Sequence, residues 1–219
     1  MRLIDKTIQD FSRLLGSATP IPGGGSSAAV EAALGMGLIS KVALITMEKS
    51  AYTHRKDLMR HTAQSAAALG QDFLSWVDED TAAYQDFIAA KRLPQHTAEQ
   101  KAAYQQALYQ TLQVCTLIPY KILQAAVQGL HLGNAVAPDY YTGTASDLGL
   151  AALSLKTAAH GAHLTILMNL KTITSLGLPA QDLMESSFVQ DSRKQSQSLL
   201  DEAETLAQVI YTQVRKALP

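Results

Sequence analysis

Apolar residues recur along this chain at steps of three and four, the spacing that places side chains on one face of an α-helix. No segment alternates between apolar and polar residues as a half-buried strand would, and glycine- and proline-containing breaks separate the periodic stretches. The pattern predicts an all-α helical bundle of about six helices, forming a single domain over residues 1–219. The expected helices cover about residues 4–15, 28–47, 55–91, 97–130, 146–170 and 180–210.

Several residues predict where these helices begin, bend and end. Thr97 followed by Gln100 has the spacing of a capping box, and Pro119 is expected to kink the fourth helix. Residues 131–145 contain Gly, Pro and Tyr and are expected to form a loop, after which Ser146 would cap the fifth helix. The Gly177-Leu178-Pro179 break is expected to precede the last helix.

The second predicted helix, from Ala28 to Met47, is apolar almost all round. It is long enough to suggest a membrane span, but Glu31 and Lys41 lie inside it and no other segment is comparable. We therefore expect a buried core helix, for which a subunit interface is one possible place, and no membrane association.

Three consecutive glycines, Gly23 to Gly25, precede this helix. Without Cβ atoms their backbone N–H groups can point together at a ligand, and Ser26 or Ser27 could cap the helix. A helix N-terminus of this kind favours anions, but the segment completes neither a P-loop nor a dinucleotide fingerprint. A bare loop with a cap is the alternative interpretation.

Composition narrows the functional classes. The 219 residues carry 18 basic and 19 acidic side chains, with no long run of either sign, so a nucleic-acid track is not expected. Cys115 is the one cysteine, which excludes an internal disulfide and a cysteine metal cluster, and it is most simply a core side chain. The N-terminus lacks the hydrophobic region of a signal peptide, and we expect a cytoplasmic protein.

Asp80 occupies a position that the third helix should reserve for an apolar residue. The buried stripe of this helix consists of Leu69, Phe73, Trp76, Tyr84 and Phe87, and Asp80 falls among them. A carboxyl group there would be partly desolvated, which raises its pKa and allows proton exchange near neutral pH. The alternative is a buried Asp that caps another helix or pairs with a basic group.

Asp147 and Asn169 are weaker candidates. Asp147 follows Ser146 in the first turn of the fifth helix, where a negative charge is favoured by the helix dipole. Asn169 lies among apolar residues, so its amide needs a partner on a neighbouring helix or on a ligand.

No metal site is expected. His160 and His163 share a face of the fifth helix with Lys156, but no third ligand follows at a telling spacing. His54 and His61 are best explained as surface residues, and Ser26 lacks the His and acid partners that a nucleophile requires.

Taken in order, several short motifs resemble the formimidoyltetrahydrofolate cyclodeaminase and methenyltetrahydrofolate cyclohydrolase family. Each motif alone is weak, but the ordered set is specific and extends from about residue 3 to residue 215. The motifs are Thr19-Pro20-Ile21-Pro22-Gly23-Gly24-Gly25-Ser26, Val77-Asp78-Glu79-Asp80 with Tyr84, Arg92-Leu93-Pro94 with Thr97-Ala98-Glu99-Gln100-Lys101, Gly133-Asn134, Ser146-Asp147-Leu148 and Leu167-Met168-Asn169-Leu170.

The resemblance implies an all-α fold, a homodimer or larger assembly, and a folate site lined by the glycine loop. The family's catalytic aspartate falls on Asp80, which the helical pattern singles out independently. No metal or redox cofactor is implied. The residues that would border or shape the folate pocket are Gly23, Gly24, Gly25, Ser26, Asp147 and Asn169, with Lys49 and Tyr52 as a basic and aromatic segment, and Lys91 and Arg92 are candidates for the glutamate tail.

Two departures from the family pattern affect the expected substrate. The loop from Ala135 to Ala145 is longer than the family's usual connection, and Thr165 stands where an asparagine is common. The leading hypothesis is formimidoyltetrahydrofolate cyclodeaminase, the alternative is methenyltetrahydrofolate cyclohydrolase, and a third possibility is a non-catalytic folate-binding scaffold.

Overall fold

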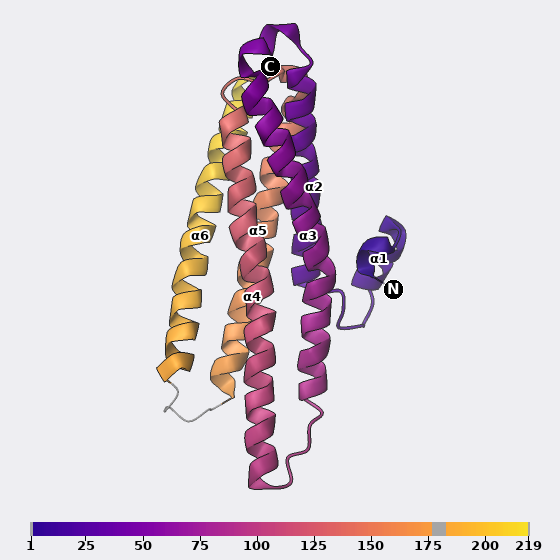
Figure 1. Cartoon of the computed structure of the whole chain (residues 1–219), viewed down its shortest axis with the longest axis vertical. Helices are drawn as coiled ribbons and strands as arrows, with labels where there is room; N and C mark the ends of the chain where they lie inside the picture. The colour runs from indigo at the N-terminus through magenta and orange to yellow at the C-terminus, as the bar shows by residue number, and fades with distance from the viewer. Residues whose placement is uncertain (1, 177–182, 219) are drawn as a thin grey trace.

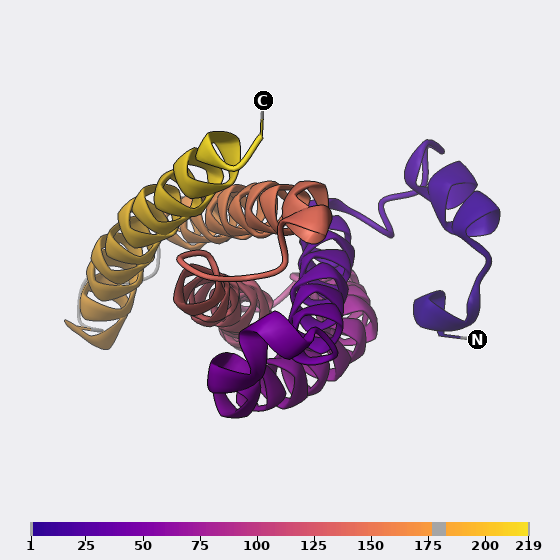
Figure 2. The same cartoon turned by 90° about the horizontal axis from the view of Figure 1, so that it is seen from above.

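The computed structural model, which describes residues 2–176 and 183–218, contains helices and no strands in these ranges. Helices of 24 to 39 residues pack lengthwise as a bundle, and a helix of eight residues stands to one side (Figures 1 and 2). The elements are η1 (Leu3–Asp5), α1 (Ile8–Leu15), α2 (Gly24–Met47), η2 (Ser50–Arg55), α3 (Lys56–Ala90), α4 (Ala98–Val136), η3 (Thr142–Thr144), α5 (Ala145–Ser175) and α6 (Leu183–Lys216). The predicted all-α class is confirmed.

α2 lies in the middle of the bundle, against α3, α5 and α4. Small residues on its inner face, among them Ala29, Ala32 and Gly35, let the neighbouring backbones approach closely. A Cβ on Gly35 would lie 3.0 Å from Leu155 and 3.2 Å from a backbone oxygen of α5, so this contact needs glycine. By length and composition α2 could also cross a bilayer, and it is the one described helix for which that holds.

The first predicted helix is divided in two. Leu3–Asp5 forms a 3-10 turn, and α1 begins only at Ile8, where the Thr7 hydroxyl accepts a hydrogen bond from the Asp10 amide. Figures 1 and 2 show α1 apart from the bundle, and Ile8 is 90% exposed. The amphipathic pattern of this segment therefore predicted a helix correctly but not its burial.

The fourth helix extends further than expected. Thr97 and Gln100 form the predicted capping box, and α4 runs through the buried Pro119 to Val136. The prediction of a loop over residues 131–145 was therefore wrong for its first six residues, because Leu130, Gly133 and Val136 continue the buried stripe.

The predicted cap of α5 was also wrong. α5 begins at Ala145 with Thr144 as its N-cap and without a capping side chain, so Ser146 is already helical and exposed. Asp147 does lie in the first turn, as predicted. The Gly177-Leu178-Pro179 break lies outside the described residues, and α6 buries Ala203 and Ile210 as its pattern predicts.

Candidate active site

A pocket of about 420 Å³ surrounds Asp80 at the N-terminal end of α2. Side chains and backbone from α2, α3, α4 and α5 meet there, and the segment before α2 forms part of the wall. Leu164 and Met168 line the pocket and are 61% and 62% exposed, so its mouth reaches the protein surface. The lining residues are Pro20, Ile21, Gly23, Gly24, Gly25, Asp80, Tyr84, Cys115, Gly161, Leu164, Thr165, Met168 and Asn169.

The carboxylate of Asp80 lies directly against the first turn of α2. A Cβ built on Gly25 would fall 2.2 Å from Asp80 Oδ1, so only a residue without a side chain fits between the two helices. The fully buried Ser26 donates a hydrogen bond from Oγ to Asp80 Oδ2 at 2.7 Å. The glycine segment therefore lets a helix start approach the acid closely enough for the next residue to hold it.

Ser26 does not act as the cap that its position suggested. The N-cap of α2 is Gly23, in an extended conformation and without a side-chain hydrogen bond, and Ser26 lies inside the helix. Its hydroxyl is directed across to α3, where it contacts both Asp80 and Thr81. The prediction of a Ser26 cap was wrong because a buried carboxylate on another helix competes for the same hydroxyl.

Two opposing effects set the proton affinity of Asp80. Burial raises its pKa above the ordinary value of 3.8, and hydrogen bonds from the Ser26 hydroxyl and backbone offset part of that rise. The net direction is upward. None of the ion pairs among the described residues includes Asp80, so no basic side chain fixes it in the ionised form.

Asn169 of α5 and Cys115 of α4 line the pocket on the side of α4, and Pro119 lies four residues after Cys115 in the same helix. Proline has no N–H, so Pro119 cannot donate to the carbonyl of Cys115 four residues earlier. The amide Nδ2 of Asn169 in α5 donates to that carbonyl instead, at 2.7 Å. The half-buried amide of Asn169 thus replaces, from a second helix, the donor that Pro119 cannot provide.

Comparison with known proteins identifies the relatives of this chain. Residues 7–178 match the family model described as formiminotransferase-cyclodeaminase. The chain belongs to the formiminotransferase-cyclodeaminase family. It is 32% identical over 209 residues to the formimidoyltransferase-cyclodeaminase of Sus scrofa, covering 92% of this chain but 38% of the pig protein.

Two further proteins match this chain along almost their whole lengths. The methenyltetrahydrofolate cyclohydrolase of Methylorubrum extorquens is 28% identical over 211 residues, which cover 96% of this chain and 97% of that protein. The crystal structure of formiminotetrahydrofolate cyclodeaminase from Thermotoga maritima superposes with a TM-score of 0.76 at 20% identity, covering 98% of this chain and 96% of that one. The latter comparison shows a shared fold.

The structure brings together six of the site residues that the sequence and the family resemblance predicted, in the Asp80 pocket or directly beside it. Asp80, Gly23, Gly24 and Gly25 line the pocket, as does Asn169, and Ser26 hydrogen-bonds to Asp80 from behind. Thr165, where family members commonly have asparagine, also lines the pocket and donates to the Gly161 carbonyl at 2.9 Å.

Three residues carried over from the family lie elsewhere in this chain. Lys49 and Tyr52 follow the C-terminal end of α2, about 36 Å from its start at 1.5 Å per residue. Asp147 lies near the same end of the bundle, where Oδ1 pairs with Lys41 Nζ at 3.0 Å. The ammonium group of Lys49 lies 4.6 Å from the centre of the Tyr141 ring. Within one chain these residues do not reach Asp80.

The remaining candidates have structural partners. Lys91 lies over the Phe87 ring at 5.7 Å, at the end of α3. His160 pairs with Glu204 at 2.9 Å and His54 with Asp139 at 2.8 Å, while burial lowers the pKa of His163. The described residues contain no group of three or more His, Cys, Asp or Glu side chains arranged to hold a metal ion.

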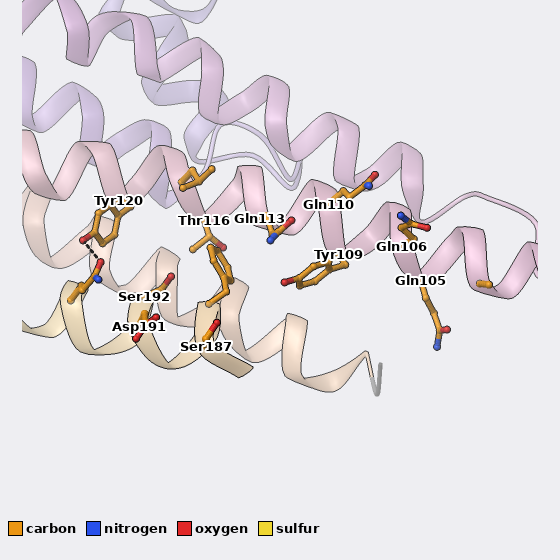
Figure 3. A pocket seen from close by; sticks show the side chains of 14 residues that line it. Gln105, Gln106, Tyr109, Gln110, Gln113, Thr116, Tyr120, Ser187, Asp191 and Ser192 are labelled. Atoms are coloured by element: carbon orange, nitrogen blue, oxygen red, sulfur yellow. Dashed lines mark hydrogen bonds between the residues drawn. The ribbon is translucent and has the colours of Figure 1, made fainter. Parts of the chain in front are cut away.

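A larger cavity, of about 870 Å³, lies between α4 and α6 (Figure 3). Its walls are mostly glutamine, serine and tyrosine side chains, and Tyr120 donates to Gln195 across it at 2.8 Å. Asp191 is the one carboxyl group on the lining. Because this carboxyl group belongs to an exposed residue, the cavity is a weaker candidate than the Asp80 pocket despite its size.

Part of the pocket lining could not be recognised from the sequence. Cys115 was interpreted as a core residue, whereas it is buried and also borders the pocket, and burial raises the pKa of its thiol to about 12. Gly161 and Leu164 gave no signal, because an outward position on an apolar helix has no distinctive spacing, and Met168 was noted only as part of the motif around Asn169.

Proposed function

We propose that this protein is a folate one-carbon enzyme that acts on the one-carbon bridge of tetrahydrofolate, with Asp80 as its proton-transferring residue. The observation that carries the proposal is a carboxyl group of raised pKa, hydrogen-bonded by Ser26 and closely approached by Gly25, in a surface-reaching pocket of a formiminotransferase-cyclodeaminase family member. A group of this kind can both accept and return a proton near neutral pH.

The leading reaction is the cyclodeamination of formimidoyltetrahydrofolate. The aminobenzoyl nitrogen of the folate attacks the formimidoyl carbon and forms a tetrahedral carbon that bears an amino group between two nitrogens. The attacking nitrogen loses its proton, and the amino group must gain one to leave as ammonia. Asp80 accepts the first proton and delivers the second, which yields the methenyl product.

The raised pKa of Asp80 favours this order of steps. An aspartate with the ordinary pKa of 3.8 would be almost fully ionised at pH 7 and a poor proton donor to a departing amine. Both steps are proton transfers, so the residues that the pocket supplies suffice without a metal or redox cofactor. A non-catalytic scaffold is disfavoured because Asp80 lies in the pocket without an ion-pair partner among the described residues.

Methenyltetrahydrofolate cyclohydrolase is a second candidate, because the Methylorubrum extorquens relative of that name matches this chain along 97% of its own length. In that reaction water adds to the methenyl carbon, Asp80 takes the proton of the attacking water, and the ring opens to the formyl product. The two reactions share the tetrahedral carbon and differ in whether it carries an amino or a hydroxyl group.

The test is to supply each substrate to the wild type and to the Asp80→Asn variant. Formation of the methenyl chromophore from formimidoyltetrahydrofolate, followed by ultraviolet absorbance, reports cyclodeamination, and loss of that band above the spontaneous rate reports cyclohydrolysis. We expect Asp80→Asn to lower kcat by about 10²- to 10⁴-fold in the active direction. A wild type that accelerates neither conversion would overturn the enzyme proposal.

A further inference from the structure

A second cavity shares a wall with the Asp80 pocket. It has a volume of about 490 Å³, is bordered by Ile21, Asp78, Thr81 and Gln85 among others, and is called here the back cavity. Ile21 also lines the Asp80 pocket, so the segment before α2 separates the two cavities. Gln85 is exposed, so the back cavity has its own opening to solvent.

A chain of hydroxyl groups crosses this wall. Ser26 Oγ lies 2.7 Å from Asp80 Oδ2 and 3.2 Å from Thr81 Oγ1. Asp80 borders the Asp80 pocket, Thr81 borders the back cavity, and the fully buried Ser26 connects them. The three side chains therefore form one continuous hydrogen-bonded path from the acid to the second cavity.

Both hydroxyl groups on this path are able to pass a proton along. A hydroxyl has a donor and two acceptor sites, so it can receive a proton on one side while it gives its own away on the other. In the structure Ser26 donates to Asp80, and the contact between Ser26 and Thr81 can run in either direction. Hydrogen bonds that follow one another in a buried chain also polarise and strengthen each other. The path therefore has the composition that proton transfer requires.

The two candidate reactions differ in what they leave on Asp80. Cyclodeamination of a protonated formimidoyl group yields a methenyl cation and ammonia, and the proton taken from the attacking nitrogen leaves with the ammonia. Cyclohydrolysis joins a methenyl cation and water, and yields a neutral formyl group and one free proton. The ring nitrogen regains one proton of the water as the ring opens, and the other stays on Asp80. The acid must lose this proton before it can act as a base again.

The mouth of the Asp80 pocket is a poor exit for that proton. Leu164 and Met168 border the mouth, and neither side chain has a transferable proton. A folate in the pocket also displaces the water that would otherwise reach Asp80 from this side. The path through Ser26 runs inside the protein, so a bound folate does not interrupt it.

We infer that Ser26 and Thr81 form a proton relay that carries the proton of each cyclohydrolysis turnover from Asp80 to solvent in the back cavity. Asp80 passes its proton from Oδ2 to Ser26 Oγ, Ser26 gives its own proton to Thr81 Oγ1, and Thr81 releases one to water. The neutral acid becomes a carboxylate and one hydrated proton appears outside, so protons and charge balance. Once the hydroxyls turn back, Ser26 again donates to the carboxylate, as in the structure. The inference rests on the proposed function, and within it on the cyclohydrolysis reaction.

The ionisable groups around this path lie at its two ends. Tyr84 and Cys115 border the Asp80 pocket, and Arg2, Lys6 and Asp78 border the back cavity. Burial raises the pKa of Cys115 to about 12, so its thiol stays protonated at neutral pH and does not compete for the proton. The carboxylate of Asp78 and the solvent around it can accept the proton that leaves the relay.

The first experiment removes the Thr81 hydroxyl at nearly unchanged side-chain volume. In Thr81→Val, kcat for the loss of the methenyl band should fall about 10-fold at low buffer concentration, with little change in KM. Added imidazole, a small proton carrier, should restore kcat in Thr81→Val and leave the wild type unaffected. Thr81→Ser keeps a hydroxyl at this position and should behave as the wild type.

Thr62→Val is the matched control, because Thr62 lies in the same helix and its buried hydroxyl has no hydrogen-bond partner among the described residues. It should neither lower kcat nor create a dependence on imidazole. A Thr81→Val variant with the wild-type kcat, or one whose loss imidazole does not restore, would overturn the relay. So would a wild type that converts formimidoyltetrahydrofolate but not methenyltetrahydrofolate, since that reaction leaves no proton to carry away.

The second experiment needs no turnover. Ser26→Ala removes a hydroxyl donor that lowers the pKa of Asp80, so the titration of Asp80, followed by NMR of the aspartate carboxyl carbons, should shift to higher pH. Ser75→Ala, which removes a hydroxyl bonded to Glu79 in the same helix, should leave the Asp80 titration unchanged. An unshifted titration in Ser26→Ala would show that the path is absent in solution and would overturn the relay. If the wild type converts neither folate, the proposed function fails, while this titration still decides whether the path exists.

Discussion

Asn169 supplies the hydrogen bond that Pro119 removes from α4. The Asn169 amide donates to the Cys115 carbonyl at 2.7 Å, and this carbonyl is the one that the N–H of residue 119 would bond in an uninterrupted helix. The contact fastens α5 to α4 at the wall of the Asp80 pocket.

We expect Asn169→Ala to lower the free energy of unfolding by about 1–3 kcal/mol, because the buried carbonyl loses its partner. In the Pro119→Ala background the backbone N–H at position 119 becomes available to that carbonyl. Asn169→Ala should therefore lower the free energy of unfolding by less in this background. Urea unfolding of both single variants and the double variant gives the coupling. If Asn169→Ala lowered the free energy of unfolding equally in the two backgrounds, the Asn169 amide would not be replacing the N–H that Pro119 lacks.

Gly25→Ala tests the close approach of α2 to Asp80. A Cβ at this position would lie 2.2 Å from Asp80 Oδ1, so the carboxylate must move. We expect a loss of about 1–3 kcal/mol of stability from overpacking and a fall in kcat of about 100-fold from displacement of the acid.

Gly70→Ala, inside α3, is the matched control. A Cβ on Gly70 would make an ordinary 3.7 Å contact with Met36 of α2. Gly70→Ala should leave kcat unchanged and, by helix propensity, raise stability by up to about 1 kcal/mol. Equal effects of the two substitutions on kcat would argue against a steric requirement at Gly25.

The raised pKa of Asp80 predicts a specific dependence of stability on pH. Between the ordinary value of 3.8 and the higher value in the folded state, the folded protein binds more protons than the unfolded chain, so stability falls as pH rises through this range. Asp80→Asn removes this penalty. The variant should therefore unfold at a higher urea concentration than the wild type at pH 7, and the difference should shrink as pH falls towards 4.

Asp72→Asn, on the exposed side of the same helix, serves as the control and should show no such pH-dependent difference. If Asp80→Asn were less stable than the wild type at pH 7 and the difference did not vary with pH, burial would not govern the proton affinity of Asp80.

Cys115 should be inert to thiol reagents in the folded protein. Burial raises the pKa of Cys115 to about 12, so about 1 in 10,000 molecules carries a thiolate at pH 8. We expect the labelling of the native protein by a disulfide reagent to be slower than that of the urea-unfolded chain by at least about 100-fold. Rapid stoichiometric labelling of the native protein would show that the pocket exposes the sulfur.

The position of Asp80 could be predicted because a helix repeats its faces regularly. One charged residue in an otherwise apolar stripe signals a buried carboxylate, and the structure places Asp80 in a pocket with a raised pKa. The role of Ser26 could not be predicted in the same way. Local sequence favoured a cap, whereas its hydroxyl bonds a residue 54 positions away.

The compensation between Pro119 and Asn169 shows a second limit of sequence reasoning. The proline in a helix and the amide among apolar residues were each recognisable as features that need an explanation. The hydrogen bond that connects the two features forms because α4 and α5 lie side by side. The spacing of residues along the chain does not show which helices are neighbours. For the same reason Leu164 and Met168 could not be assigned to the pocket mouth.

Both ends of the segment from Leu3 to Ser26 are hydrogen-bonded to the same turn of α3. The Leu3 amide donates to the Asp78 carboxylate, and 23 residues later Ser26 donates to Asp80, so both ends of this loop are fastened within three residues of each other. A single proteolytic cut after the exposed Arg13 would therefore leave two fragments that both remain attached beside Asp80. The wall that Pro20 and Ile21 provide belongs to the fragment that carries the rest of the bundle, so a nicked protein should keep its pocket.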